Sequence, residues 1–230
     1  MQSLADLALA DNDLDGARTL ITEFLSLARG SSDIWSEAMA LNGLGDILRS
    51  SGDYVRAERA YGDAAALFNR ISEHGGMVRG AWAGLPHNLG YVTLAQGDTR
   101  RATQHFLEAA DGYQRYGPDW RGVAECVMGL GSVAVHMGQP LLAAQWFGAA
   151  EAALEALQTN FSPANRADYE RALVCCATRW LRTRWPRPGG QDAQLDWWWC
   201  WAKPRHLLSL SLRLTLIGLG ARWPTSRPAS

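Results

Sequence analysis

Two histidines, His87 and His136, are the side chains of this sequence best suited to acid–base or metal chemistry. They lie in separate segments, and neither has an acidic residue at a spacing typical of a metal site or a catalytic pair. The sequence also has no GxSxG nucleophile elbow and no phosphate-binding GxxxxGK loop followed by Ser or Thr. We therefore expect no catalytic residue, no metal and no cofactor. Both histidines are interpreted as structural residues or as part of a binding surface.

The four cysteines are not spaced like a zinc site either. Cys126, Cys175, Cys176 and Cys200 include no CxxC pair. The N-terminal segment lacks a basic region and reaches Asp6 at once, which is unlike a secretory signal. No window contains 18 uncharged apolar residues. These features predict reduced thiols, a cytoplasmic protein and no membrane span.

Charge is distributed unevenly along the chain. The net charge of the whole sequence is −1. Residues 1–178 carry 13 basic and 21 acidic side chains, a net of −8, whereas residues 179–230 carry 9 basic and 2 acidic, a net of +7. Such asymmetry indicates two segments of different kind. We expect a main domain over 1–177 and a tail over 178–230, and the acidic main domain argues against a nucleic-acid partner there.

A repeated pattern runs through the main domain. It consists of Leu-Gly, a turn position eight residues after the Leu, an Ala five later, an aromatic ring four later and a further Ala three later. Copies begin at Leu44, Leu89 and Leu130, and a degenerate copy begins at Leu4. The turn positions 12, 52, 97 and 138 are 40, 45 and 41 residues apart. Self-similarity at such a period is typical of a solenoid.

The residue types in the pattern favour a helical hairpin. Gly52 and Gly97 can adopt the left-handed conformation that ends a helix. Asp53 and Asp98 follow them and can cap the next helix. A small residue such as Gly45 lets two helices approach closely, and the Ala–ring–Ala spacing places one apolar stripe on a helix face. A single hairpin cannot bury this stripe, so neighbouring hairpins are expected to stack.

These arguments predict an all-α fold, a right-handed α-solenoid of about four long helical hairpins. Strand signals are absent before residue 180. The predicted helices cover residues 3–10, 14–29, 33–50, 53–73, 78–95, 98–116, 119–137, 140–157 and 163–177.

The spacing LG-x6-G, followed by A-x3-(F/Y) and another Ala, resembles the tetratricopeptide repeat (TPR). The usual TPR period is about 34 residues, so the resemblance is to long-hairpin relatives. Those occur in large bacterial signalling regulators of the maltose-regulator type and the ATP-binding LuxR type. The stretches "WFGAAEAALEAL" (146–157) and "ADYERAL" (167–173) are similar to the end of the repeat region in such regulators. The resemblance covers roughly residues 1–177.

The resemblance implies a concave face lined by the first helix of each hairpin, with groove positions set relative to the repeat Leu. It implies a protein or peptide partner, or a small effector, bound on that face. The chain would then be an interaction or effector-sensing module, a fragment or relative of a bacterial signal-transduction or transcriptional regulator. For each single residue the alternative is an ordinary solvated helix surface. The exposed groove positions fall on Asp6, Asn42, Asp46, Arg49, His87, Tyr91, Ser132 and His136.

The tail differs from the main domain in composition. Residues 179–230 contain seven of the 11 Trp and five of the nine Pro, including the stretch "WWWCW". We favour a frameshifted product without native-like order, because Arg, Trp, Pro and Gly dominate when a GC-rich gene is read out of frame. The alternatives are a genuine membrane-binding or partner-binding tail and an unusual folded extension. A membrane-surface adaptor acting through this tail is the alternative function.

Overall fold

The computed structural model describes the backbone of residues 2–74, 79–115 and 119–184, and the side chains of 2–74, 84–115 and 119–178. Within these residues the chain is all-helical, with nine helices and no strand, which confirms the predicted all-α class. The helices are α1 (Gln2–Ala10), α2 (Leu14–Gly30), α3 (Ile34–Ser50), α4 (Tyr54–Glu73), α5 (Arg79–Ala95), α6 (Thr99–Arg115), α7 (Trp120–His136), α8 (Pro140–Ala156) and α9 (Pro163–Arg184).

The last helix differs most from its prediction. We expected it to end at residue 177, but α9 continues to Arg184 and so crosses the proposed boundary between main domain and tail. The predictions about the order and role of residues 185–230 fall outside the described residues.

The turns between paired helices have the predicted backbone conformation. Asn12, Gly52, Gly97 and Gly138 all have positive φ angles, of 61°, 83°, 87° and 72°. At Gly52 the amide N–H donates to the Arg49 carbonyl over 3.0 Å, which satisfies a carbonyl at the helix end. Positive φ favours glycine, which explains why three of the four turn positions carry it.

The helices that follow three of these four turns are capped by an aspartate, whereas α8 begins after Gln139 without a side-chain cap. The Asp53 carboxylate accepts a hydrogen bond from the backbone N–H of Arg56 over 3.1 Å, and Asp98 accepts one from Arg101 over 2.9 Å. These bonds satisfy backbone donors that have no partner inside the helix. The predicted N-caps are therefore confirmed.

Within three of the hairpins the aromatic ring of the second helix packs on a glycine of the first. A methyl group on Gly90 would come within 2.6 Å of the Phe106 ring, so only glycine allows this approach. The repeat pattern therefore reflects both the turn and the contact between the two helices of a hairpin. The pairs are Gly45 with Tyr61, Gly90 with Phe106, and Gly131 with Phe147.

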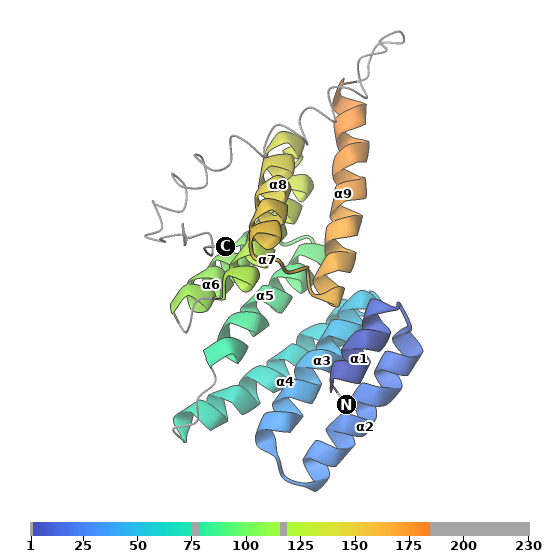
Figure 1. The fold of residues 1–230 in the computed structure, drawn as a ribbon, viewed down its shortest axis with the longest axis vertical. Helices are drawn as coiled ribbons and strands as arrows, with labels where there is room; N and C mark the ends of the chain where they lie inside the picture. The colour runs from blue at the N-terminus through green and yellow to red at the C-terminus, as the bar shows by residue number, and fades with distance from the viewer. Residues whose placement is uncertain (1, 75–78, 116–118, 185–230) are drawn as a thin grey trace, which may run out of the picture.

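Consecutive helices pack side by side along the chain, from α1 against α2 to α7 against α8 (Figure 1). The exception is α9, which packs beside α8 and α7 and also contacts α1 and α3. In Figure 1 the first turn of α9 reaches the ends of α1 and α3, far from it in the sequence. The last helix therefore connects the beginning of the structure with its end.

The buried apolar residues form two main clusters that meet at α5. One cluster joins α1 to α5 and includes Tyr61 and Phe68; the other joins α5 to α9 and includes Phe106 and Phe147. Two neighbouring residues of α5 belong to different clusters: Val92 lies in the first and Tyr91 in the second.

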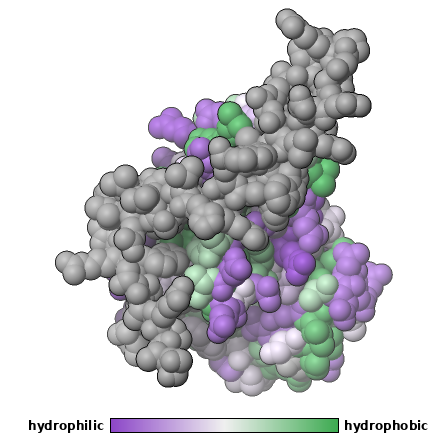
Figure 2. Space-filling view, turned by 45° about the horizontal axis from the view of Figure 1, so that its top comes forward, coloured by the Kyte–Doolittle hydropathy of each residue, from purple (hydrophilic) through white to green (hydrophobic). Residues whose placement is uncertain are grey.

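On the face seen in Figure 2, hydrophilic side chains are interspersed with smaller apolar areas. Among the described helices, none has both the length and the apolar character that a membrane crossing requires.

Candidate functional site

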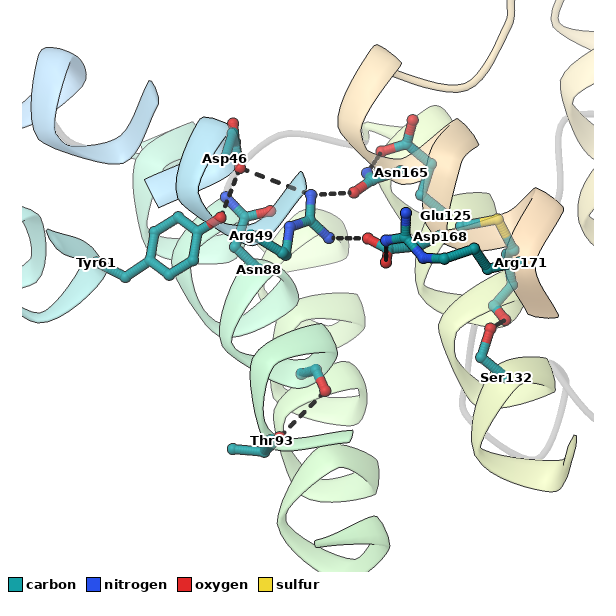
Figure 3. A network of polar contacts seen from close by, with 12 residues as sticks. Asp46, Arg49, Tyr61, Asn88, Thr93, Glu125, Ser132, Asn165, Asp168 and Arg171 are labelled. Atoms are coloured by element: carbon teal, nitrogen blue, oxygen red, sulfur yellow. Dashed lines mark hydrogen bonds and ion pairs between the residues drawn. The ribbon is translucent and has the colours of Figure 1, made fainter. Parts of the chain in front are cut away.

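A buried group of polar side chains lies where α3, α4, α7 and α9 come together (Figure 3). At its centre is Arg49, whose side chain is 1% exposed. Burying a charge is costly unless it is paired, so such a group is either strongly bound or functional. We call this group the Arg49 cluster; it consists of Asp46, Arg49, Tyr61, Glu125, Asn165 and Asp168.

Arg49 uses both ends of its guanidinium group to bind α9. Its Nη1 donates to Oδ2 of Asp168 over 2.6 Å, and its Nη2 donates to Oδ1 of Asn165 over 2.9 Å. Nη2 also lies 3.6 Å from Oδ1 of Asp46, and the guanidinium carbon is 4.7 Å from the centre of the Tyr91 ring. Burial alone would lower the pKa of Arg49, but the charges of its neighbours, Asp168 foremost, together outweigh this effect and raise the pKa. Arg49 therefore stays charged.

Glu125 holds the start of α9 from the other side. Its Oε1 accepts a hydrogen bond from the backbone N–H of Ser162, and its Oε2 accepts one from Nδ2 of Asn165, both over 2.7 Å. Asn165 therefore accepts from Arg49 on α3 and donates to Glu125 on α7. Burial raises the pKa of Glu125, while the bonds from Ser162 and Asn165 and the charge of Arg121 oppose that rise.

Asp46 joins the cluster to α4 and faces α1. The Tyr61 hydroxyl donates to Oδ1 of Asp46 over 2.7 Å. Burial raises the pKa of Asp46 to about 6, although the charge of Arg49 acts in the opposite direction. The negative charges of Asp6 and Asp168 add to this rise.

His87 and Tyr91 lie one turn apart on α5, beside Arg49. Their rings meet edge to face with centroids 5.3 Å apart, and His87 makes a similar contact with Phe106 at 5.9 Å. Burial, with a contribution from the charge of Arg49, lowers the pKa of His87 to about 3. His87 Nε2 and the Tyr91 hydroxyl have no hydrogen-bond partner in the described part of the chain. His87 is therefore a neutral residue packed among aromatic rings.

Five of the predicted groove residues lie close to one another: Asn42, Asp46, Arg49, His87 and Tyr91. Arg49 contacts Asp46 and the Tyr91 ring, and Tyr91 contacts His87. Asn42 is held to α5, because Nδ2 of Asn88 donates to its Oδ1 over 3.1 Å. A sixth, Asp6 on α1, acts on this group through the effect of its charge on Asp46.

Two predicted residues are not part of this group. The Ser132 hydroxyl donates to the Met128 carbonyl of its own helix over 3.3 Å. His136 is exposed at the end of α7, and its Nδ1 lies 3.0 Å from the Ser132 carbonyl.

The expectation that all these positions are exposed is wrong for four of them. Arg49, His87, Tyr91 and Ser132 are all at most 4% exposed. For Arg49 the cause is α9, which packs on α3 and α7 and receives both ends of the guanidinium. For His87 and Tyr91 the rings of α5 and α6 provide much of the cover.

Sequence reasoning did not assign four members of the cluster to the site: Tyr61, Glu125, Asn165 and Asp168. A signal for the last two was present, since Asp168 lies four residues before Ala172 and Asn165 four before Tyr169, on the side of α9 that is buried. Polar residues on an apolar helix face indicate buried partners. Nothing local in the sequence pairs them with Arg49, which lies 119 residues before Asp168.

Within the described residues, no group of three or more His, Cys, Asp or Glu side chains is placed to hold a metal ion. Cys126, Cys175 and Cys176 are free thiols. No model of a known protein family matches the chain, and no curated protein matches it. The proposals below therefore depend on the geometry of the Arg49 cluster and on the repeat pattern.

Proposed function

We propose that the main domain is a TPR-like interaction module whose hairpins stack into a right-handed solenoid and whose first helices bind a protein or peptide partner. The observation that carries this proposal is the docking of α9. A helix from the far end of the chain lies against α3 and α7, where the repeat resemblance implies a binding face. A surface that accepts one helix in this way has the chemistry to accept a partner.

The contacts of the Arg49 cluster support recognition of a peptide in particular. An arginine that binds a carboxylate and an amide at once gives charge-assisted hydrogen bonds with defined geometry. Buried arginine and aromatic side chains are the usual anchors of protein interfaces, and Tyr91 lies directly beside Arg49. Catalysis receives no comparable support, because the one buried histidine of the site is held neutral by burial and packed among rings.

The repeat resemblance also leads us to propose the wider setting. The module is a part or a relative of a bacterial signal-transduction or transcriptional regulator that acts in the cytoplasm. Its role there is to bind a regulatory partner without carrying out a reaction of its own.

A peptide selection tests the proposed function directly. A phage-displayed random peptide library is panned on the full chain, and the affinity of each selected peptide is measured by fluorescence anisotropy. We expect the combined substitution Asn42→Ala and Asp46→Asn to weaken binding by about tenfold or more, or about 1.4 kcal/mol. Both residues are partly exposed in the predicted face.

The matched control alters the second helices of the hairpins. Arg59 on α4 and Gln104 on α6 are exposed, and changing both to Ala should leave peptide affinity unchanged. Circular dichroism of each variant checks that the fold is retained. Peptides that depend on Arg59 and Gln104 but not on Asn42 and Asp46, or a library from which no peptide is retained, would overturn the proposal.

A further inference from the structure

We propose that the first turns of α9 are an internal ligand, and that a partner helix of the same chemistry binds in their place. The recognised feature is the N-terminal part of a helix with an amide side chain and, three residues later, a carboxylate. In this chain Asn165 and Asp168 supply those two groups. This inference rests on the proposed function and specifies the partner of the same site.

The two recognised side chains lie on one side of α9 because residues three apart share a helix face. Both reach the same guanidinium, at 2.9 Å from Asn165 and 2.6 Å from Asp168. The guanidinium is buried and charged, so it needs an anionic partner wherever water is excluded. A ligand without a carboxylate at the second position leaves the buried charge of Arg49 without its close anionic partner.

Glu125 adds a requirement for the start of a helix. One of its oxygens accepts from the backbone N–H of Ser162, the residue directly before α9, and the other accepts from the side-chain amide of Asn165. Ser162 is the N-cap residue of α9, and the backbone N–H at this position has no partner within the helix. Glu125 therefore selects both a helix N-terminus and an amide at a fixed distance from it.

The charges around Arg49 also fix the order of the two groups. A ligand with the carboxylate first and the amide second would bring its negative charge against Glu125 and its amide against Arg49. The carboxylate would still lie beside Nη2 of Arg49, but it would repel Glu125, and the hydrogen bond that Asn165 donates to Glu125 would be lost. The site therefore distinguishes amide–x–x–acid from acid–x–x–amide, which have the same composition.

The opposite side of α9 leaves room for exchange. Arg166 and Glu170, which pair with each other over 3.1 Å, have side chains that are 65% and 63% exposed. They make no contribution to the Arg49 cluster. A competing helix must replace the polar contacts of Ser162, Asn165 and Asp168 and must also displace the buried side chains of Ala164 and Tyr169 in the same turns of α9.

The experiment uses a fluorescein-labelled peptide of residues 160–174, NFSPANRADYERALV, and the full chain. A second peptide has the residues that correspond to Asn165 and Asp168 exchanged and is otherwise identical. The receptor is the full chain with Asn165→Ala and Asp168→Ala, which weakens the internal ligand. We expect the native-order peptide to bind this receptor at least about tenfold tighter than it binds the wild-type chain, whose site is occupied. The exchanged peptide should bind the receptor at least about tenfold weaker than the native-order peptide.

A chain with Arg166→Ala and Glu170→Ala is the matched receptor control and should behave as the wild type. If the receptor variant does not fold, the wild-type chain supplies the test. Excess native-order peptide should raise amide hydrogen exchange across residues 163–170 of the wild-type chain, and the exchanged peptide should not. Equal binding of both peptides, or binding of neither to any chain together with unchanged exchange, overturns the inference. If selected library peptides still depend on Asn42 and Asp46 in that case, the proposed function stands and only the internal-ligand inference fails.

Discussion

Arg49 keeps a full positive charge in a place from which water is almost excluded, and its partners make this possible. Asp168 neutralises it, Asn165 satisfies a second nitrogen, and the Tyr91 ring covers its face. Replacing a whole buried pair with apolar residues is often neutral, whereas removing one member is costly. The arrangement therefore specifies which helix docks here more than it adds stability to the fold.

Replacing Arg49 with Ala should lower the free energy of unfolding by about 3 kcal/mol, measured by urea denaturation. The loss lies at the low end for a broken buried pair because Asp168 keeps its ion pair with Arg171 on the same helix. Arg56→Ala is the matched control, since Arg56 is 62% exposed and pairs with Asp53 over 3.5 Å. It should cost less than about 1 kcal/mol. Similar losses for the two variants would contradict the buried role of Arg49.

Asp46 should make part of the stability depend on pH. Its pKa in the folded protein is about 6, above the ordinary aspartate value of 3.8, so the folded state binds a proton more readily than the unfolded state. Stability from this residue is therefore gained as pH falls below about 6. Relative to an Asp46→Asn variant, the wild type should gain about 1 kcal/mol between pH 7 and pH 5, measured by urea denaturation at each pH.

The titration of His87 changes stability with pH in the opposite direction, so its contribution must be separated from that of Asp46. Its pKa is lowered to about 3, so the unfolded state takes up the proton first and stability is lost as pH falls below 6.5. Both chains contain His87, and the difference between them cancels its contribution. If the difference in free energy of unfolding between the wild type and the Asp46→Asn variant does not change between pH 7 and pH 5, Asp46 has an ordinary pKa.

The helices and their turns are the part of the fold that the sequence specifies locally. A glycine at φ 83° in position 52 and an aspartate that caps the next helix are settled within a few neighbouring residues, so both could be predicted. The Ala and ring positions of the pattern likewise proved to be buried, with Ala102 and Phe106 fully covered. The length of α9 was predicted less well, because its end was assigned to the change in composition near residue 178, whereas the first proline after that point is Pro186, two residues beyond the observed end.

A larger side chain at a buried repeat Ala should overpack the hairpin. Ala102 on α6 is fully buried, so Ala102→Leu should lower the free energy of unfolding by about 1–3 kcal/mol and reduce the melting temperature clearly. Ala66 on α4 is exposed, and Ala66→Leu should have little effect. Thermal denaturation followed by circular dichroism measures both variants. A neutral Ala102→Leu beside a harmful Ala66→Leu would mean that the assignment of helix faces is wrong.

At the scale of the whole molecule, α9 joins parts that lie far apart in the sequence. The two main core clusters meet at α5, and α9 contacts α1 and α3 on one side and α7 and α8 on the other. The candidate site arises from this long-range contact, which explains why it could be predicted only in part. The residues of α3 and α5 follow from the repeat, but a helix that returns across 119 residues leaves no periodic signal.

Removing the Asp168 carboxylate should increase local opening of α1 and of the first turns of α9 more than that of the other helices. Asp168→Ala leaves the buried Arg49 with the more distant Asp46 as its nearest carboxylate. The first turns of α9 should therefore separate from α3 and expose the part of α1 that they contact. We expect amide hydrogen exchange in α1 and in residues 163–168 to rise by about tenfold or more, which corresponds to about 1.4 kcal/mol. Exchange in α6, which packs between α5 and α7, should change little. Glu170→Ala removes an exposed carboxylate from the same helix and should leave all three regions unchanged. A uniform rise across α1, α6 and α9 in the Asp168 variant would instead show that the contact stabilises the whole fold equally and does not act as a local connection between its two ends.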